Sequence, residues 1–389
     1  MPIQRIALSL AAAVLLGATA LTGLAQAEPG VTKNQIVVGS SLDLSGPGAP
    51  IGVPMKRGLD VGAQMINDHG GINGRKLKVI IYDNGLQVPK GLLAVDKLLN
   101  QDHVFAFVAL MGSPLVQAAE HKIMAAGRPI MFPIAPLQAL YDPPQHLLAA
   151  FEDDFSDQFA RATTWALANL HSKRVCLLES QGMDNAVHHA IETVLKAHGL
   201  PLAGYETYSF GAVDLSSQIA RLKADRCDLV MLNSLVRDAA AAVREREKLA
   251  WKVNFIVGQA STGIGLIKLG GKASEGTYGI TTQLGYHAIK NLPVVKELAK
   301  LYRAAGYPGE PDEGFFGGYQ ALALFAAAAR RAGPDLTVAS LIKGLDSLKD
   351  FNSGTGHTPM TFSETQRLGS TAGFIIQVRD GQWDKISDF

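Results

Sequence analysis

Residues 36–42, IVVGSSL, are followed by the segment SGPGAPIG at 45–52 and by a stretch at 54–69 with apolar residues at helical spacing. The short apolar run predicts a buried strand, and the Gly and Pro residues predict a turn. Gly70 and Gly71 supply the left-handed residue at which a helix commonly ends. This stretch therefore predicts a strand, a loop and a helix in succession.

The same unit recurs along the chain. A first series continues with predicted strands at 76–83, 104–110 and 128–135 and helices at 89–100 and 114–126. A second series has predicted strands at 174–180, 205–210, 228–233 and 254–259 and helices at 186–198, 215–224 and 239–249. Short apolar strands alternating with amphipathic helices indicate parallel sheets covered on both faces. The chain is therefore predicted to form two α/β lobes.

The rest of the chain is too small for a third lobe. It has a strand-like run at 277–284 and helical patterns at 293–305, 317–332 and 338–348, which we expect to complete the first lobe. The tail, TAGFIIQVRDGQW, predicts a β-hairpin that turns at Asp380 and Gly381. A chain that crosses between lobes more than once has a hinge made of several strands.

The first 27 residues predict an export signal. Arg5 precedes the apolar run 6–24, and Ala25 and Ala27 form a cleavage pattern ahead of Glu28. An uncleaved membrane anchor is the alternative, because the run is almost long enough to cross a bilayer, but the polar residues after it favour removal. We therefore expect a periplasmic protein that is not inserted in the membrane.

Composition narrows the function classes. The 389 residues carry 36 basic and 35 acidic side chains, a balance that gives no electrostatic footprint for nucleic acid.

Cys176 and Cys227 are the two cysteines. Export would permit a disulfide between them, while their apolar surroundings equally suit reduced core residues, so both outcomes stay open.

No catalytic signature is present: the sequence lacks the nucleophile elbow, the zinc helix, the phosphate-binding loop and paired CxxC motifs. His188 and His189 diverge by about 100° on a helix, so they predict a solvated surface and no metal site. Gly46, Gly48 and Gly52 depart from the dinucleotide fingerprint and predict a tight turn near a small ligand. We expect no enzyme activity and no cofactor.

Ligands of open α/β sheets bind at the carboxyl ends of the strands. The loops expected there are 48–52, 109–114, 134–137, 180–185, 233–237 and 259–263. Ser113 followed by Pro114 suggests a helix start, with Ser113 as the N-cap. The same hydroxyl and the free amides also suit an anion, so a cap and an anion site both stay open.

Three segments together resemble a known family: IVVGSSLDLSGPGAPIG at 36–52, AQMINDHGGINGRKLKVIIYD at 63–83 and GRPIMFPIA at 127–135. In order and spacing they resemble the type I periplasmic binding proteins of ATP-driven importers, specifically the branched-chain amino acid (Leu/Ile/Val) binding family. The resemblance covers essentially the whole mature chain, and 66–83 is its most specific part.

The resemblance implies an α/β fold of two doubly wound parallel-sheet lobes joined by a three-strand hinge. The crossovers would fall near 148–152, 276–280 and 351–359. After a signal peptide at 1–27, the N-terminal lobe would comprise 34–150 and 280–350, and the C-terminal lobe 151–279 and 351–389.

The resemblance also implies a ligand pocket. Ser113 matches the serine that holds the ligand's carboxylate, and Ile134, Ala135 and Pro136 match a segment that offers backbone groups and a hydroxyl, which Pro136 lacks. The acid expected beside Gln259 is replaced by Ala260. Without that acid a buried ammonium would be unpaired, at a cost of several kcal/mol.

Further pocket positions follow from the same resemblance. The family's frequent tyrosines align with Ile51, Asp184 and Leu235, and apolar wall is expected from Leu110, Met111 and Phe315. Gly112, next to Ser113, is expected in the site as well. Asp184 would receive a cation or hydroxyl of the ligand, or else only cap the helix that follows it.

The resemblance implies a monomeric solute-binding protein that delivers its ligand to the membrane permease of an ABC importer. The substitutions favour a carboxylate with an apolar body over a standard α-amino acid. Branched-chain or other hydrophobic amino acids remain an alternative. A sensor subunit for a membrane signalling partner is another, which neighbouring kinase or cyclase genes would favour over permease and ATPase genes.

Overall fold

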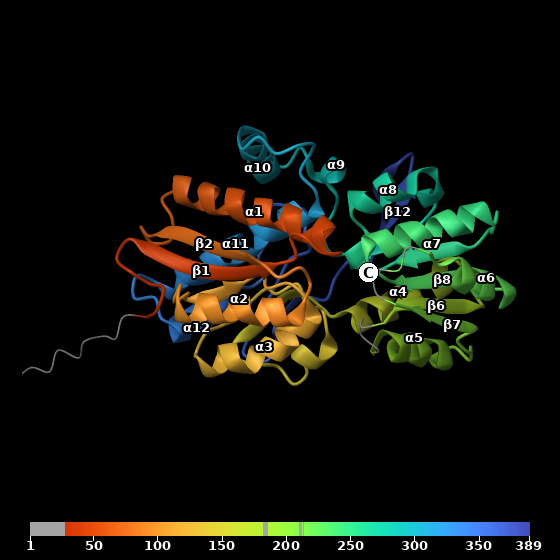
Figure 1. Cartoon of the computed structure of the whole chain (residues 1–389), viewed down its shortest axis with the longest axis horizontal. Coiled ribbons are helices and arrows are strands. Elements are labelled where there is room, and N and C mark those ends of the chain that lie inside the picture. Colours follow the sequence, from red (N-terminus) through yellow and green to blue (C-terminus); the bar gives the residue numbers. More distant parts are fainter. Residues whose placement is uncertain (1–27, 182–185, 210–211, 213) are drawn as a thin grey trace, which may run out of the picture.

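The chain folds into two α/β lobes set side by side (Figure 1). The structure is a computed structural model that describes residues 28–181, 186–209, 212 and 214–389; the expected signal at 1–27 lies outside this range. Each lobe is built on one sheet in which parallel pairing predominates. This confirms the expected fold class.

The sheet of the first lobe has the strand order β11-β5-β4-β3-β1-β2, and every pairing in it is parallel. Its strands are β1 (Gln35–Leu42), β2 (Lys76–Asp83), β3 (Ala106–Val108), β4 (Ile130–Met131), β5 (Leu148–Glu152) and β11 (Leu368–Ser370). Strands β1 to β4 lie within or beside the apolar runs that predicted them, whereas β5 and β11 were not predicted as strands.

The second sheet has the order β13-β12-β10-β9-β8-β6-β7. Its strands are β6 (Val175–Ser180), β7 (Gly204–Tyr208), β8 (Leu229–Asn233), β9 (Asn254–Val257), β10 (Tyr278–Thr281), β12 (Phe374–Arg379) and β13 (Gln382–Asp388). The last two form the expected hairpin, in which Arg379 pairs with Gln382 across the turn at Asp380 and Gly381.

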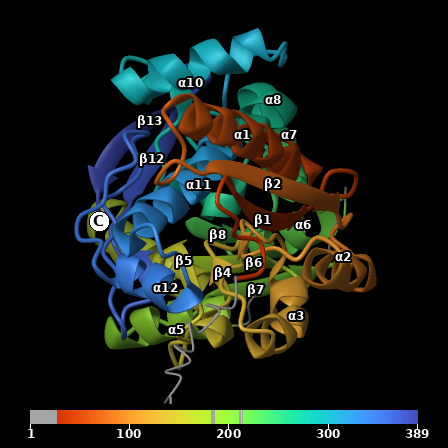
Figure 2. The same cartoon turned by 90° about the vertical axis from the view of Figure 1, so that its left-hand side faces the viewer.

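Helices cover both faces of each sheet. In the first lobe, α1, α11 and α12 pack on one face and α2 and α3 on the other (Figure 2). The helices associated with this lobe are α1 (Ala49–Asp68), α2 (Val88–Asn100), α3 (Ser113–Ala125), α9 (Tyr286–Ile289), α10 (Pro293–Ala304), α11 (Glu313–Ala332) and α12 (Val338–Asp346). The second lobe has α4 (Phe155–Asn169), α5 (Ala186–Ala197), α6 (Ser216–Ala224), α7 (Val236–Lys248) and α8 (Ile264–Gly270).

Helices α1 and α11 pack closely although they are far apart in sequence. A Cβ added to Gly58 would lie 1.9 Å from Phe315 O, and one added to Gly318 would lie 2.2 Å from Met55 O. The absence of side chains at these positions lets the two backbones approach. This packing attaches the late helices to the first lobe, as the sequence predicted.

Three crossings join the lobes, after β5, after β10 and between β11 and β12. The first two lie next to their expected positions, but the third lies at 371–373 and not at 351–359. The reason is that Leu368 and Ser370 pair with β5, while Met360 and Phe362 are buried in the core of the first lobe. The first lobe therefore extends to Ser370, which corrects the expected limits 280–350 and 351–389.

The starts of two helices, α1 and α4, also differ from the sequence prediction. Helix α1 begins at Ala49, so the expected loop at 48–52 is mostly helix. A Cβ on Gly52 would lie 1.9 Å from Asp43 O, so this glycine serves helix-to-strand packing. Helix α4 was not predicted; Asp154 caps it by accepting a hydrogen bond from Asp157 N at 3.1 Å.

Cys176 and Cys227 form a disulfide. Cys176 lies in β6, and Cys227 lies just before the neighbouring strand β8. The pairing of the two strands brings the sulfur atoms together, which decides between the two outcomes that the sequence left open. Among the described helices, none has the length and apolarity needed to cross a bilayer.

Candidate ligand-binding cleft

Two adjoining cavities lie between the lobes, at the carboxyl ends of the strands. The Ser113 cavity has a volume of about 530 Å³ and includes Ser113 and Leu235 on its opposite walls. The Glu313 cavity has a volume of about 180 Å³ and includes Glu313, Gln259 and the hinge residue Glu152. Four of the described residues line both cavities: Ile134, Pro136, Phe155 and Ala260.

The Ser113 cavity is formed around the start of α3. Gly112 is the N-cap and has a φ of 113°, a backbone conformation that favours glycine. Ser113 is the first helical residue, one position after the N-cap. The prediction that the Ser113 side chain caps the helix is therefore wrong. Among the described residues, none forms a hydrogen bond with the Ser113 hydroxyl, which leaves it available to a ligand.

Hydrogen bonds to neighbouring segments hold the loop before α3 in place. The fully buried Asn84 donates through Nδ2 to Ser41 O at 3.2 Å and to Met111 O at 3.0 Å. Gly112 N donates to Ile134 O at 3.1 Å. These bonds hold the start of α3 in a set position, so the Ser113 hydroxyl and the helix amides are preorganised.

The Ser113 cavity is apolar apart from a few neutral polar groups. Among the described residues that line it, the polar side chains are those of Asn84, Ser113, Gln117 and Gln181, and none is Asp, Glu, Lys, Arg or His. A helix N-terminus attracts negative charge through its free amides and its dipole. The cavity can therefore hold an anionic group beside an apolar body.

The segment 134–136 has its backbone groups largely engaged within the protein. Ile134 O accepts from Gly112 N, Ala135 O accepts from Tyr141 Oη at 3.0 Å, and Pro136 O accepts from Phe155 N at 3.2 Å. The segment therefore contributes mainly a wall to the cavity, and few of its backbone groups are free to bind a ligand. Through the bond to Phe155 N, Pro136 also contacts the start of α4 in the second lobe.

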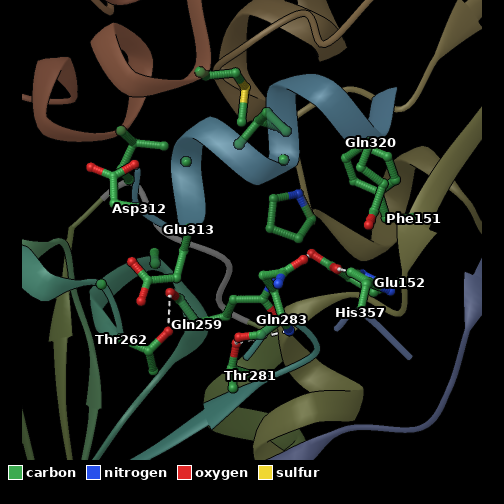
Figure 3. A pocket seen from close by; sticks show the side chains of 18 of the residues that line it. Phe151, Glu152, Gln259, Thr262, Thr281, Gln283, Asp312, Glu313, Gln320 and His357 are labelled. Carbon is green, nitrogen blue, oxygen red and sulfur yellow. Dashed lines mark hydrogen bonds and ion pairs between the residues drawn. The ribbon is translucent and has the colours of Figure 1, made fainter. Parts of the chain in front are cut away.

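The Glu313 cavity is formed around the start of α11 (Figure 3). Asp312 caps this helix by accepting from Phe315 N at 3.0 Å. Glu313 follows, and its Oε2 accepts from Ile264 N of the second lobe at 3.4 Å. Burial raises the pKa of Glu313 to about 7, and the negative charge of Asp312 adds to the effect.

Glu152 joins the hinge segments on the other side of the same cavity. Its Oε1 accepts from Gln259 Nε2 at 2.8 Å, and its Oε2 accepts from Thr282 Oγ1 at 2.5 Å. His357 Nε2 lies 3.2 Å from the same Oε2. Figure 3 shows Glu152 and His357 together at this end of the cavity. One carboxylate therefore connects both lobes and the segment after β10.

The structure brings ten of the thirteen predicted site residues to the two cavities. Met111, Gly112, Ser113 and Leu235 line the Ser113 cavity, and Ile51, Ala135 and Gln259 line the Glu313 cavity, while Ile134, Pro136 and Ala260 line both. Leu110 and Phe315 are fully buried in the core and do not line either cavity. Asp184 lies outside the described residues.

Sequence reasoning missed the polar groups of the Glu313 cavity: Glu152, Gln283, Asp312, Glu313, Gln320 and His357. Asp312 and Glu313 stand at the start of an apolar helical pattern, where acids are common as caps, so they carried no distinct signal. His357 lies between α12 and β11, in the part of the first lobe that was mistaken for the third crossing, and its backbone pairing with Gln283 brings it to Glu152. Among the described residues, no group of three or more His, Cys, Asp or Glu side chains is arranged to hold a metal ion.

Two α/β lobes that enclose a ligand-sized cleft at their strand ends define a two-lobed solute-binding protein. The comparisons with known proteins agree. The model of the family "Periplasmic binding protein" matches residues 35–382. The chain therefore belongs to the periplasmic binding protein family, a family of binding proteins and not of enzymes.

The relatives are distant in sequence. The chain is 22% identical over 354 residues to a Leu/Ile/Val-binding protein homolog of Brucella melitensis, covering 89% of this chain and 92% of that protein. It is 24% identical over 254 residues to the Leu/Ile/Val-binding protein of Escherichia coli, covering 65% of this chain and 69% of that protein. At low identity, the chain is therefore similar to Leu/Ile/Val-binding proteins over most of its length.

Solved structures show the same fold. A branched-chain amino acid ABC transporter protein from Thermus thermophilus with bound valine has a TM-score of 0.82 and 17% identity, covering 92% of this chain and 97% of that one. A fatty acid ABC transporter substrate-binding protein from Thermomonospora curvata has a TM-score of 0.80 and 22% identity, covering 94% of both chains. At these identities the likeness concerns the fold alone.

Proposed function

We propose that the protein captures a small organic acid in the cleft, in the periplasm, and delivers it as a monomer to the permease of an ABC importer. The acid has a carboxylate, which binds at Ser113 and the start of α3, and an apolar body. The observation that carries this proposal is the lining of the Ser113 cavity, whose described residues offer an anion site and apolar walls but no acidic side chain.

The lack of an acidic side chain at position 260 is the reason for proposing an organic acid and not an α-amino acid as the ligand. The ammonium of an α-amino acid is on the carbon next to the carboxylate, so it would enter the Ser113 cavity together with the carboxylate. Ala260 lines this cavity where the family resemblance leads us to expect an acid. An unpaired buried ammonium costs several kcal/mol, which disfavours amino acids.

Branched-chain amino acids are the second candidate, because the Escherichia coli relative is a Leu/Ile/Val-binding protein and one solved neighbour holds valine. Another neighbour is described as a substrate-binding protein for fatty acids, so the fold serves both kinds of ligand. The family alone therefore does not choose between the candidates.

Calorimetric titration with matched ligands tests the proposal. Leucine and 4-methylpentanoate differ only in the α-ammonium, and phenylalanine and 3-phenylpropanoate form a second such pair. We expect the acid of each pair to bind at least tenfold more tightly than the amino acid. Tighter binding of leucine or phenylalanine would overturn the proposal and favour the second candidate.

Thermal unfolding gives an independent readout of the same ligands. A ligand at about 100 times its Kd stabilises the folded state by about 2.7 kcal/mol. A panel of aliphatic and aromatic acids, amino acids, amides and polyamines therefore ranks the ligand classes in one experiment. The largest shift is expected among the monocarboxylic acids.

A further inference from the structure

The Glu313 cavity continues the Ser113 cavity toward the hinge. The two share the walls formed by Ile134, Pro136, Phe155 and Ala260. A ligand whose carboxylate is at Ser113 therefore directs its opposite end toward Glu313 and the hinge. The chemistry of this second cavity decides what that end is.

Gln283 presents a buried acceptor in the wall of the Glu313 cavity. Its Nε2 donates to Leu284 O at 2.9 Å and to Thr355 O at 2.5 Å, and because carbonyl oxygens only accept, these bonds fix the orientation of the amide. Its Oε1 is buried and has no hydrogen-bond partner among the described residues, and the residue is only 7% exposed. An unsatisfied buried acceptor of this kind favours a donor brought by a ligand.

Glu313 adds acceptor capacity. Its carboxylate receives one hydrogen bond from another described residue, the long bond of 3.4 Å from Ile264 N. A carboxylate offers about four acceptor positions. Glu313 therefore retains free acceptor capacity on the side of the cavity opposite the hinge (Figure 3).

Three hydroxyl and amide donors that line the same cavity are used within the protein. Thr281 Oγ1 donates to Gln283 O at 2.8 Å, and Thr262 Oγ1 donates to Gln259 O at 2.9 Å. Gln259 Nε2 donates to Glu152. No Lys or Arg is among the described residues that line the cavity. The cavity therefore has a surplus of acceptors over donors.

Gln320 adds an adaptable group to the wall. It is 1% exposed, and one end of its amide is held by Ser353 Oγ at 2.9 Å and Thr355 Oγ1 at 3.3 Å. Because hydroxyls both donate and accept, these partners allow either orientation of the amide. The other end makes no hydrogen bond with the described residues, so Gln320 can either donate to or accept from a ligand.

We propose that the Glu313 cavity binds a hydrogen-bond-donating group, such as a hydroxyl, amide or amine, at the end of the ligand remote from its carboxylate. This inference rests on the proposed function and narrows it: the preferred ligand is an acid with a polar group at its far end. The raised pKa of Glu313 agrees with this environment, because a partly protonated carboxyl tolerates a neutral donor.

Matched acids test the inference. Hexanoate is compared with 6-hydroxyhexanoate, and 3-phenylpropanoate with 3-(4-hydroxyphenyl)propanoate, by calorimetric titration. In at least one pair we expect the hydroxylated acid to bind at least tenfold more tightly to the wild-type protein. In Glu313→Ala this ratio should fall at least fivefold, and in Glu313→Gln, which keeps an acceptor, it should be partly retained. The control is Glu310→Ala, at an exposed position just before α11, and circular dichroism checks that each variant folds.

The outcomes separate the two proposals. If the acids bind but neither pair shows a preference, or if Glu313→Ala leaves the ratio unchanged, the inference is wrong and the proposed function stands. If no acid binds but 4-methylphenol binds and depends on Glu313, the carboxylate proposal is wrong while the donor site stands. If none of these probes binds, both are overturned.

Discussion

Gln259 Nε2 of the second lobe donates to Glu152 Oε1 of the first lobe at 2.8 Å. The bond lies where β5 leaves the first sheet, and Thr282, which follows β10, donates to the other oxygen of the same carboxylate. Two of the three crossings therefore meet at Glu152. The carboxylate fixes the relative position of segments that any opening of the lobes has to move.

Replacement of Glu152 by Ala should destabilise the protein. The change leaves Gln259 and Thr282 without their acceptor, and such unpaired groups cost about 1 to 3 kcal/mol. Urea unfolding measures the loss, and small-angle scattering checks whether the lobes also separate. Glu152→Gln keeps one acceptor and should lose less, while Glu364→Ala, at an exposed site, is the control. An unchanged unfolding midpoint for Glu152→Ala would contradict the hinge role.

Replacement of Ser113 by Ala should weaken binding of 4-methylpentanoate by about 1 to 3 kcal/mol, because a hydroxyl that bonds a carboxylate is removed. Calorimetric titration measures the change. Stability should alter little, since the Ser113 hydroxyl does not cap α3. Ser217→Ala, at an exposed position in the first turn of α6, is the control. Unchanged affinity would remove Ser113 from the ligand site.

Stability should fall as the pH rises from about 5 to 7.5. Burial raises the pKa of Glu313 to about 7, of Asp153 to about 7 and of Asp238 to about 6. A carboxyl with a raised folded-state pKa holds its proton more tightly in the folded state. Its stabilising contribution is complete below its unfolded pKa and is lost as the pH rises through the folded value.

Thermal unfolding at pH 5 and pH 7.5 measures this effect, and we expect a melting temperature lower by a few degrees at pH 7.5. Glu313→Gln removes one titrating group, so the difference between the two pH values should shrink. Glu310→Gln should leave it unchanged. A melting temperature that rises over this interval would show that other groups dominate.

Loss of the disulfide should destabilise the second lobe. The Cys176–Cys227 bridge spans 51 residues, and closing a loop of this length contributes about 2 to 4 kcal/mol. The double variant Cys176→Ser/Cys227→Ser, or reduction of the wild-type protein, should lower the urea midpoint accordingly. The reductant should have no effect on the double variant, which provides the control. Equal midpoints before and after reduction would contradict the prediction.

Gly58→Ala should separate α1 from α11. The added methyl would lie 1.9 Å from Phe315 O, and overpacking of this kind costs about 1 to 3 kcal/mol. Gly317→Ala is a matched control on α11, because its methyl would meet only the flexible end of Met55 at 3.2 Å. Urea unfolding of both variants should show a clear loss for Gly58 and almost none for Gly317. Similar values would contradict the packing argument.

Much of the fold follows from local patterns. The alternation of apolar strands with amphipathic helices predicted both lobes, and the Asp380–Gly381 turn predicted the terminal hairpin. The third crossing was misplaced because it depends on whether the short strand Leu368–Ser370 pairs with β5. Such pairing joins residues more than 200 positions apart, and nothing in the local sequence records it.

The candidate site was likewise predicted only in part from local sequence patterns. The turn before α3 identified Ser113 and its neighbours, because helix starts and strand ends have local signatures. Leu110 and Phe315 have the expected apolar character, but they face the core, since side-chain direction is set by packing and not by hydrophobicity.

The sequence alone determined the class of fold, the residues around Ser113 and the presence of alanine instead of an acid at position 260. These features depend on residue type and local order. Only the tertiary structure decided that Glu152, Gln283, Glu313 and His357 gather in one cavity and that the two cysteines are joined. The physical reason is that hydrogen bonds, burial and pKa shifts depend on distance in space, which the chain sets only when separate segments pack together.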